Sequence, residues 1–151
     1  MNHLQNCKYV SVTPPAAIID NASATTAAID CLGYDYATII VYLGAMDIAM
    51  TVLKVQESDA SGSGFADVAG LIFGTSADIA GATSALPTAT DDNGFFIFEV
   101  DLRNRKRYLD LVATCGDGAA GTYLTALAIL SRAKDQPVIA AERGAVQILR
   151  V

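Results

Sequence analysis

Short runs of β-forming residues, each closed by glycine, proline, asparagine or aspartate, recur along the whole chain and constrain its fold more than any other feature. Runs of this kind at regular spacing are typical of antiparallel sandwiches, jelly rolls and open barrels. The runs that predict strands are 8–13, 23–32, 35–43, 50–57, a weaker 65–73, 95–102, 108–115 and 122–131. We therefore expect an all-β fold, an antiparallel β-sandwich or jelly-roll-like single domain with a long loop and extended termini.

Three of these runs carry further information. Ile39–Tyr42 is almost continuously apolar and β-branched, which indicates a central strand buried on both faces. The run 50–57 alternates apolar and polar side chains with period two, as a half-buried strand does. The run 122–131 also satisfies a helical reading, but the flanking glycines and the preceding runs favour a strand.

The runs 95–102 and 108–115 are predicted to pair as a hairpin, and their connection is strongly basic. Arg103–Arg107 carries four positive charges in five residues, which repel one another and must lie in solvent or against carboxylates. Two interpretations stay open. The connection is either a solvated hairpin tip or an electrostatic contact in which arginines bind carboxylates of a neighbouring subunit.

The 151 residues fit one domain with its own hydrophobic core. We divide it into an N-terminal arm at 1–15, a β-body at 16–135 and a C-terminal segment at 136–151. Within the body, the Ala-, Thr- and Gly-rich stretch 74–94 is predicted to be a long loop. The C-terminal segment is too apolar to float in water, so it either returns to the domain's own sheet or pairs with another chain as an added strand.

Residues suited to catalysis or metal binding are few. His3 is the single histidine and has no aspartate or cysteine near it in the sequence. Cys7, Cys31 and Cys115 are too widely spaced for a zinc site and too few for a disulfide framework, so we expect small buried residues. The glycine-rich turn at 62–64 lacks the Lys-Ser/Thr that a phosphate-binding loop needs. We therefore predict no enzyme, no catalytic residues, no cofactor and no metal.

Composition narrows the range of partners. The net charge of −6 argues against nucleic acid, because lysine and arginine supply most of that affinity. The longest apolar stretch, 37–46, falls well short of the roughly 20 residues of a membrane helix, and no secretory signal opens the sequence. Only 17% of the residues are charged, against about 25% in typical soluble domains. A lightly charged surface favours a subunit that a neighbour covers.

A family resemblance is carried by four stretches: FEVDLRNRKRYL at 98–109, ALAILSRA at 126–133, VTPPA at 12–16 and IDCLGYD at 29–35. Together they look like small virion structural proteins of tailed bacteriophages. The resemblance implies a capsid decoration, or cement, protein that binds the outside of the phage head, stabilises capsomer junctions and assembles as a homotrimer. The alternative is a head- or tail-fibre or connector subunit with a receptor- or glycan-binding role.

This resemblance implies the major capsid protein and further copies of the chain as partners, with no nucleic acid and no membrane. The protein would be made in the host cytoplasm and located on the phage head. The candidate contacts with sister subunits or the capsid are His3, Leu4, Arg103, Arg105, Lys106, Arg107, Val146, Ile148, Leu149 and Val151. A glycan site normally needs exposed aromatics, and we expect it to lack them because there is no tryptophan and the phenylalanines are predicted in strand cores.

Overall fold

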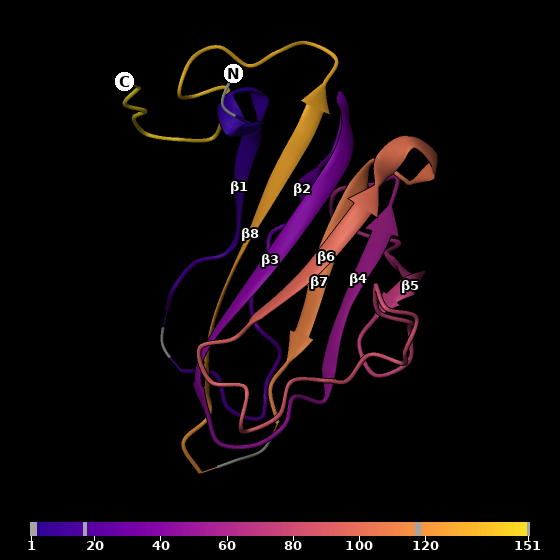
Figure 1. The fold of residues 1–151 in the computed structure, drawn as a ribbon, viewed down its shortest axis with the longest axis vertical. Coiled ribbons are helices and arrows are strands. Elements are labelled where there is room, and N and C mark those ends of the chain that lie inside the picture. Colours follow the sequence, from indigo (N-terminus) through magenta and orange to yellow (C-terminus); the bar gives the residue numbers. More distant parts are fainter. Residues whose placement is uncertain (1–2, 17, 117–118, 151) are drawn as a thin grey trace.

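The computed structural model describes residues 3–16, 18–116 and 119–150, which form two facing β-sheets (Figure 1). Sheet I has the order β1-β8-β3-β6, from Lys8–Thr13, Thr122–Ala133, Tyr34–Met46 and Phe95–Asp101. Sheet II has the order β2-β7-β4-β5, from Ile29–Asp30, Tyr108–Thr114, Val52–Ser58 and Ala66–Ile72. Two short 3-10 helices, η1 (His3–Asn6) and η2 (Leu102–Asn104), complete the elements.

The strand order is that of a jelly roll. The first strand pairs with the last, the second with the seventh, the third with the sixth and the fourth with the fifth, and every pair is antiparallel. These four pairs follow one another along a single long antiparallel ribbon. Alternate pairs of the ribbon belong to sheet I and to sheet II, which face each other. The predicted all-β sandwich is confirmed.

The predicted hairpin between 95–102 and 108–115 is wrong. β6 pairs with β3 in sheet I, whereas β7 lies between β2 and β4 in sheet II. The basic connection therefore crosses from one sheet to the other. Both strands alternate because both face the same core, Phe98 from one side and Leu111 from the other. Alternation reports which side chains are buried and carries no information about the sheet to which a strand belongs.

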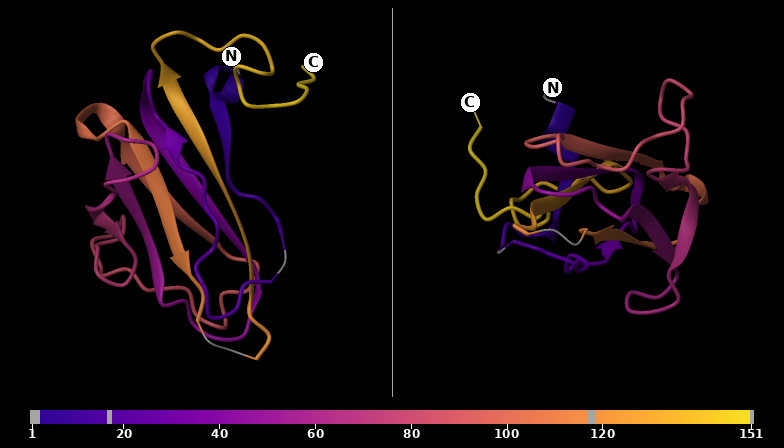
Figure 2. Two further views of the ribbon diagram at one scale, coloured as in Figure 1. Left: turned by 180° about the vertical axis from the view of Figure 1, so that it is seen from behind. Right: turned by 90° about the horizontal axis from the view of Figure 1, so that it is seen from below.

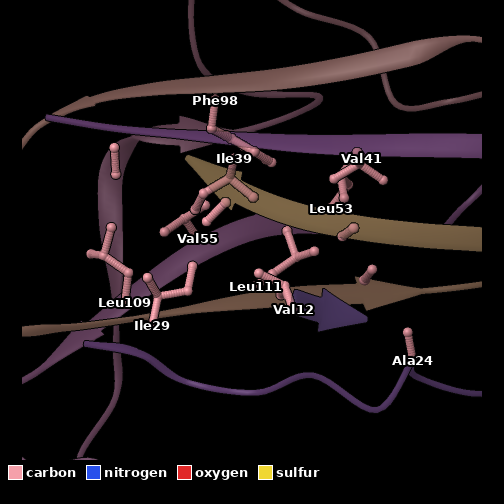
Figure 3. Packing of buried hydrophobic residues seen from close by; sticks show 14 of the residues in the cluster. Val12, Ala24, Ile29, Ile39, Val41, Leu53, Val55, Phe98, Leu109 and Leu111 are labelled. Atoms are coloured by element: carbon pink, nitrogen blue, oxygen red, sulfur yellow. The ribbon is translucent and has the colours of Figure 1, made fainter. Parts of the chain in front are cut away.

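The core lies between the sheets and is filled by alternate side chains of the strands. Figure 3 shows residues of both sheets, such as Ile39 and Leu111, pointing into the space between them. Burying an aliphatic side chain of this size stabilises the fold by about 1.5–3 kcal/mol. The three cysteines are buried, as predicted, and form no disulfide, and burial raises the pKa of Cys31 to about 12.

The prediction for Ile39–Tyr42 is half right. The run does form the middle of β3, a central strand, and the 122–131 run forms β8 beside it rather than a helix. It is not buried on both faces, however. Ile39 and Val41 are fully buried, whereas Tyr42 is 40% exposed on the outer side of the sheet. Nothing in the described part of the chain covers that side.

Other sequence boundaries also shift. The run 23–32 is mostly irregular, and only Ile29–Asp30 forms a strand in it. The stretch 74–94 is a loop, as predicted, with a single bridge between Ala77 and Thr83. The body begins at Lys8 rather than at residue 16, because β1 is an integral strand of sheet I.

The two ends of the sandwich differ. η1, the basic connection and the C-terminal segment lie at one end (Figures 1 and 2). Long turns meet at the opposite end, where the Met50 N–H donates to the Pro87 carbonyl at 3.0 Å and the Asn21 N–H donates to the Gly116 carbonyl at 3.0 Å.

Candidate interaction surfaces

The outer side of sheet I is apolar. Its members point away from the core on β3, β6 and β8, and the register places them side by side: Ile40, Tyr42, Phe95, Ile97, Tyr123, Leu127 and Ile129. Ile40 stands between Ile97 on one neighbouring strand and Leu127 on the other. Phe95 is 63% exposed and stacks on Tyr42, with ring centroids 4.6 Å apart. We call these residues the outer apolar face.

The whole chain exposes more surface than a lone domain of its size. Its accessible surface is 8604 Å², whereas a monomer of this mass is expected to expose about 7,300 Å². The excess of roughly 1,300 Å² is more than the ~800 Å² that each partner buries in a standard protein interface. The outer apolar face and the C-terminal segment both contribute to it.

The C-terminal segment is fastened to the start of β1 by Arg143, which is buried. Its Nη2 donates to the Leu4 carbonyl at 2.6 Å and its Nε donates to the Cys7 carbonyl at 3.2 Å. The Arg143 carbonyl in turn accepts from the Tyr9 N–H at 2.8 Å. Gly144 has φ +71°, and a Cβ on it would lie 2.0 Å from the Tyr9 carbonyl oxygen. This close approach requires glycine. No pattern in the sequence marks Arg143 as a buried anchor.

Beyond this anchor, residues 145–150 extend away from the body (Figure 1), and we call them the tail. Val146 is fully exposed and Leu149 is 96% exposed. The tail forms no strand, so it does not return to the sheets of its own chain. The C-terminal segment returns to its own sheet at Arg143 instead, and pairing of the tail with another chain stays a prediction. Val151 lies outside the described residues.

The basic connection is electrostatically matched within the chain. Arg107 Nη2 lies 2.7 Å from Asp30 Oδ2, and this pairing lowers the pKa of Asp30. Arg103 pairs with Asp101 and lowers the pKa of that carboxyl to about 2.

The middle cations of the connection are matched in the same way. Arg105 lies 3.5 Å from Glu57, and Lys106 lies 3.7 Å from Asp59. Each of the four cations predicted to contact a neighbour thus has a carboxylate of its own chain, and a contact of the connection with another subunit remains untested.

His3 and Leu4 open η1 beside the anchor. Leu4 has an exposed side chain and a carbonyl that accepts from Arg143. The expectation that phenylalanines lie in strand cores holds for Phe98, which is buried, and is wrong for Phe95.

Within the described ranges, no group of three or more histidine, cysteine or acidic side chains is close enough to hold a metal ion. No described helix has the length and apolar character to cross a membrane. No protein-family model, no curated protein and no solved structure matches the chain. The fold and these surfaces define a jelly-roll domain whose most unusual features are an uncovered apolar sheet face and an unpaired apolar tail.

Proposed function

We propose that this protein is a non-enzymatic structural subunit of a tailed-phage virion, a cement protein that binds the outside of the head and stabilises capsomer junctions. The observation that carries the proposal is the outer apolar face. A sheet face with neighbouring Tyr42, Phe95, Ile97 and Leu127 side chains in solvent is unfavourable for a monomer and is typical of a protein-protein interface.

The mechanism is bridging. Each copy buries its apolar face on shell subunits that meet at a junction, and separating those subunits then requires breaking the added contacts. Many copies on one shell add up to a large resistance to internal pressure. The partners are the major capsid protein and sister copies, and the protein is made in the host cytoplasm. The net charge of −6 suits the outer surface, because packaged DNA repels an acidic chain.

Binding to purified heads that lack small outer proteins tests this proposal, with co-sedimentation as the readout. We expect the wild-type chain to sediment with heads and Leu127→Asp to lose binding at least tenfold, since the substitution places a charge in the middle of the face. Leu32→Asp is the matched control, because Leu32 is an exposed leucine in the β2–β3 turn, away from the face. Thermal unfolding verifies that both variants fold. Wild-type chain that stays in the supernatant contradicts the proposal.

A second candidate, a fibre or connector subunit that binds glycans, is favoured by one observation. The stacked Tyr42 and Phe95 rings form an exposed aromatic platform, with Tyr123 also exposed on the same face. Glycan-array binding that Phe95→Ala abolishes would support this candidate. Binding to heads with no glycan signal would favour the cement protein.

A further inference from the structure

The four sheet edges of the sandwich are unequal in their protection. β1 is covered, because the Tyr9 N–H donates to the Arg143 carbonyl and the Val12 carbonyl accepts from the Ala27 N–H. β2 has only two residues. β5 pairs with β4 through an irregular register, and its Asp67 binds Lys54 at 2.7 Å. Short strands, irregular pairing, charge and covering loops are the means by which proteins prevent unwanted strand addition.

β6 lacks most of these protections, and Glu99 and Asp101 are its only charged residues. It is seven residues long, pairs with β3 without a register shift, and contains no proline or lysine. The Leu43 N–H donates to the Gly94 carbonyl, so ladder alternation directs the backbone of Phe96, Phe98 and Val100 toward β3. The backbone groups of Phe95, Ile97 and Glu99 then face the open side. Among the described residues, no backbone group bonds them there.

A groove of about 490 Å³ runs along this open edge. The groove lies between β6, an edge strand of sheet I, and β5, an edge strand of sheet II, together with the loop that follows β5. Leu71 and Phe73 line it from the β5 side and Ile97 from β6, with Phe73 packed edge-on against Phe98 at 5.0 Å. Its walls are therefore mainly apolar, and Asp78 and Glu99 make it acidic.

The tail has the properties that such a groove requires. Val146 and Ile148 alternate with Gln147 and Leu149, so a paired tail would place apolar side chains on both sides of the sheet. Arg150 is its one charge, opposite in sign to the groove. In extended form the tail spans about 20 Å, close to the length of β6.

The tail cannot pair with β6 of its own chain. Its root is fixed at β1, and β1 and β6 are opposite edges of sheet I. Three strand spacings, about 14 Å, separate them, so most of the tail would be used in crossing β8 and β3.

We propose that the tail of one copy adds to the open edge of β6 in a second copy, as a fifth strand of sheet I that fills the groove. Donor and acceptor are different surfaces at opposite edges of one sheet, so the contact is heterologous. A heterologous contact whose rotation closes generates a ring, and the trimer of the proposed function is one such ring. The inference deepens that function by naming the sister-copy contact, and rests on it only for the number of copies.

Cross-linking of purified full-length chains tests this contact. Ile97→Cys chains are mixed with Ile148→Cys chains and treated with a short bismaleimide. The native cysteines are buried and should not react. We expect a covalent dimer from the mixture that is at least tenfold more abundant than from either variant alone. The matched control replaces Ile148→Cys with Ile139→Cys, a more exposed site before the anchor, and should give no dimer.

Sedimentation velocity provides an independent measurement. The wild-type chain should sediment as a closed oligomer, and deletion of residues 145–151 should convert it to a monomer that still unfolds cooperatively, at a lower midpoint because the stabilisation by association is lost. Ile97→Pro should also give monomer, because the Ile97 N–H faces the open side and its loss removes no bond to β3. A dimer band with the Ile139→Cys control, no dimer with Ile148→Cys, or an oligomer that survives the deletion would each overturn the inference. Phage heads are absent from these measurements, so failure of head binding leaves the result intact.

Discussion

The basic connection and the tail are the two regions that a reader of the sequence would select as contacts, and the structure treats them in opposite ways. Every cation of Arg103–Arg107 has a carboxylate of its own chain. Beyond Ala145, whose N–H donates to the Ala140 carbonyl, the tail has exposed apolar side chains and belongs to no strand of the described chain. The basic connection is highly charged, and its charges are already paired within the chain. The tail has an ordinary composition, but its apolar side chains are left exposed by the described part of the chain.

The difference shows that unsatisfied groups, rather than unusual composition, indicate where a partner is needed. Exposed ion pairs lose little when they are solvated instead, so a charged cluster does not require a neighbour. An apolar segment with open backbone groups gains hydrophobic burial and main-chain hydrogen bonds when a neighbour covers it. Four measurements test this contrast, and we expect the largest change in stability from the first of them.

The largest effect should come from the anchor that joins the tail to the body. Arg143→Ala removes two hydrogen bonds from a charged donor and is expected to lower the free energy of unfolding by about 1–3 kcal/mol in denaturant titration. Arg150→Ala, in the exposed tail, is the matched control and should stay within about 0.5 kcal/mol. Equal effects of the two substitutions would mean that the anchor contributes nothing.

A smaller loss should appear on acidification. Asp101 and Asp30 have pKa values below the ordinary 3.8, so their pairing stabilises the fold above pH 4 and is lost as the pH falls toward 2. Arg107→Gln should reduce the decline in unfolding free energy over this window, and deletion of the tail should leave it unchanged. A steeper decline in Arg107→Gln would contradict this assignment.

The pairing of Arg107 with Asp30 should be weaker still. Both side chains are about half exposed, so a double-mutant cycle with Arg107→Ala and Asp30→Ala is expected to give a coupling of about 0.2–1 kcal/mol. The coupling should shrink as salt is added. A coupling that is insensitive to salt would show that the pair is shielded from solvent by another subunit, and the contrast between the two regions would then fail.

The smallest effect on stability should come from the tail itself. Val146→Asp with Leu149→Asp changes two side chains that contact almost nothing in their own chain, so at concentrations where the protein is monomeric the unfolding free energy should move by less than about 0.5 kcal/mol. A larger decrease in the unfolding free energy of the monomer would show that the tail packs against the β-sandwich of its own chain.

The sequence located most strands because alternation is a local property. The runs at 8–13, 50–57, 108–115 and 122–131 became strands within a few residues. It did not reveal their partners, since pairing joins segments far apart in the chain. Arg143 contacts a carbonyl 139 residues away, and Arg107 binds a carboxylate 77 residues away. No local pattern marks contacts of that range.

The outer apolar face was visible in the sequence but was misinterpreted. The continuous run Ile39–Tyr42 predicts a strand covered on both sides, and within one chain its outer side is not covered. The pattern is informative nevertheless. A strand with apolar side chains on both faces is typical of a strand buried on both faces, so we infer that another polypeptide buries the outer face. The same reasoning failed for Phe95, whose position directly after a turn placed it on the outer side.

The placement of both chain ends at one pole of the sandwich has a practical consequence. A copy held through those ends presents its opposite pole outwards, where the turn around Asp91–Asn93 lies. That turn leads directly into Phe95 of the outer apolar face, so an epitope inserted there would report whether this pole is accessible or covered in the bound molecule.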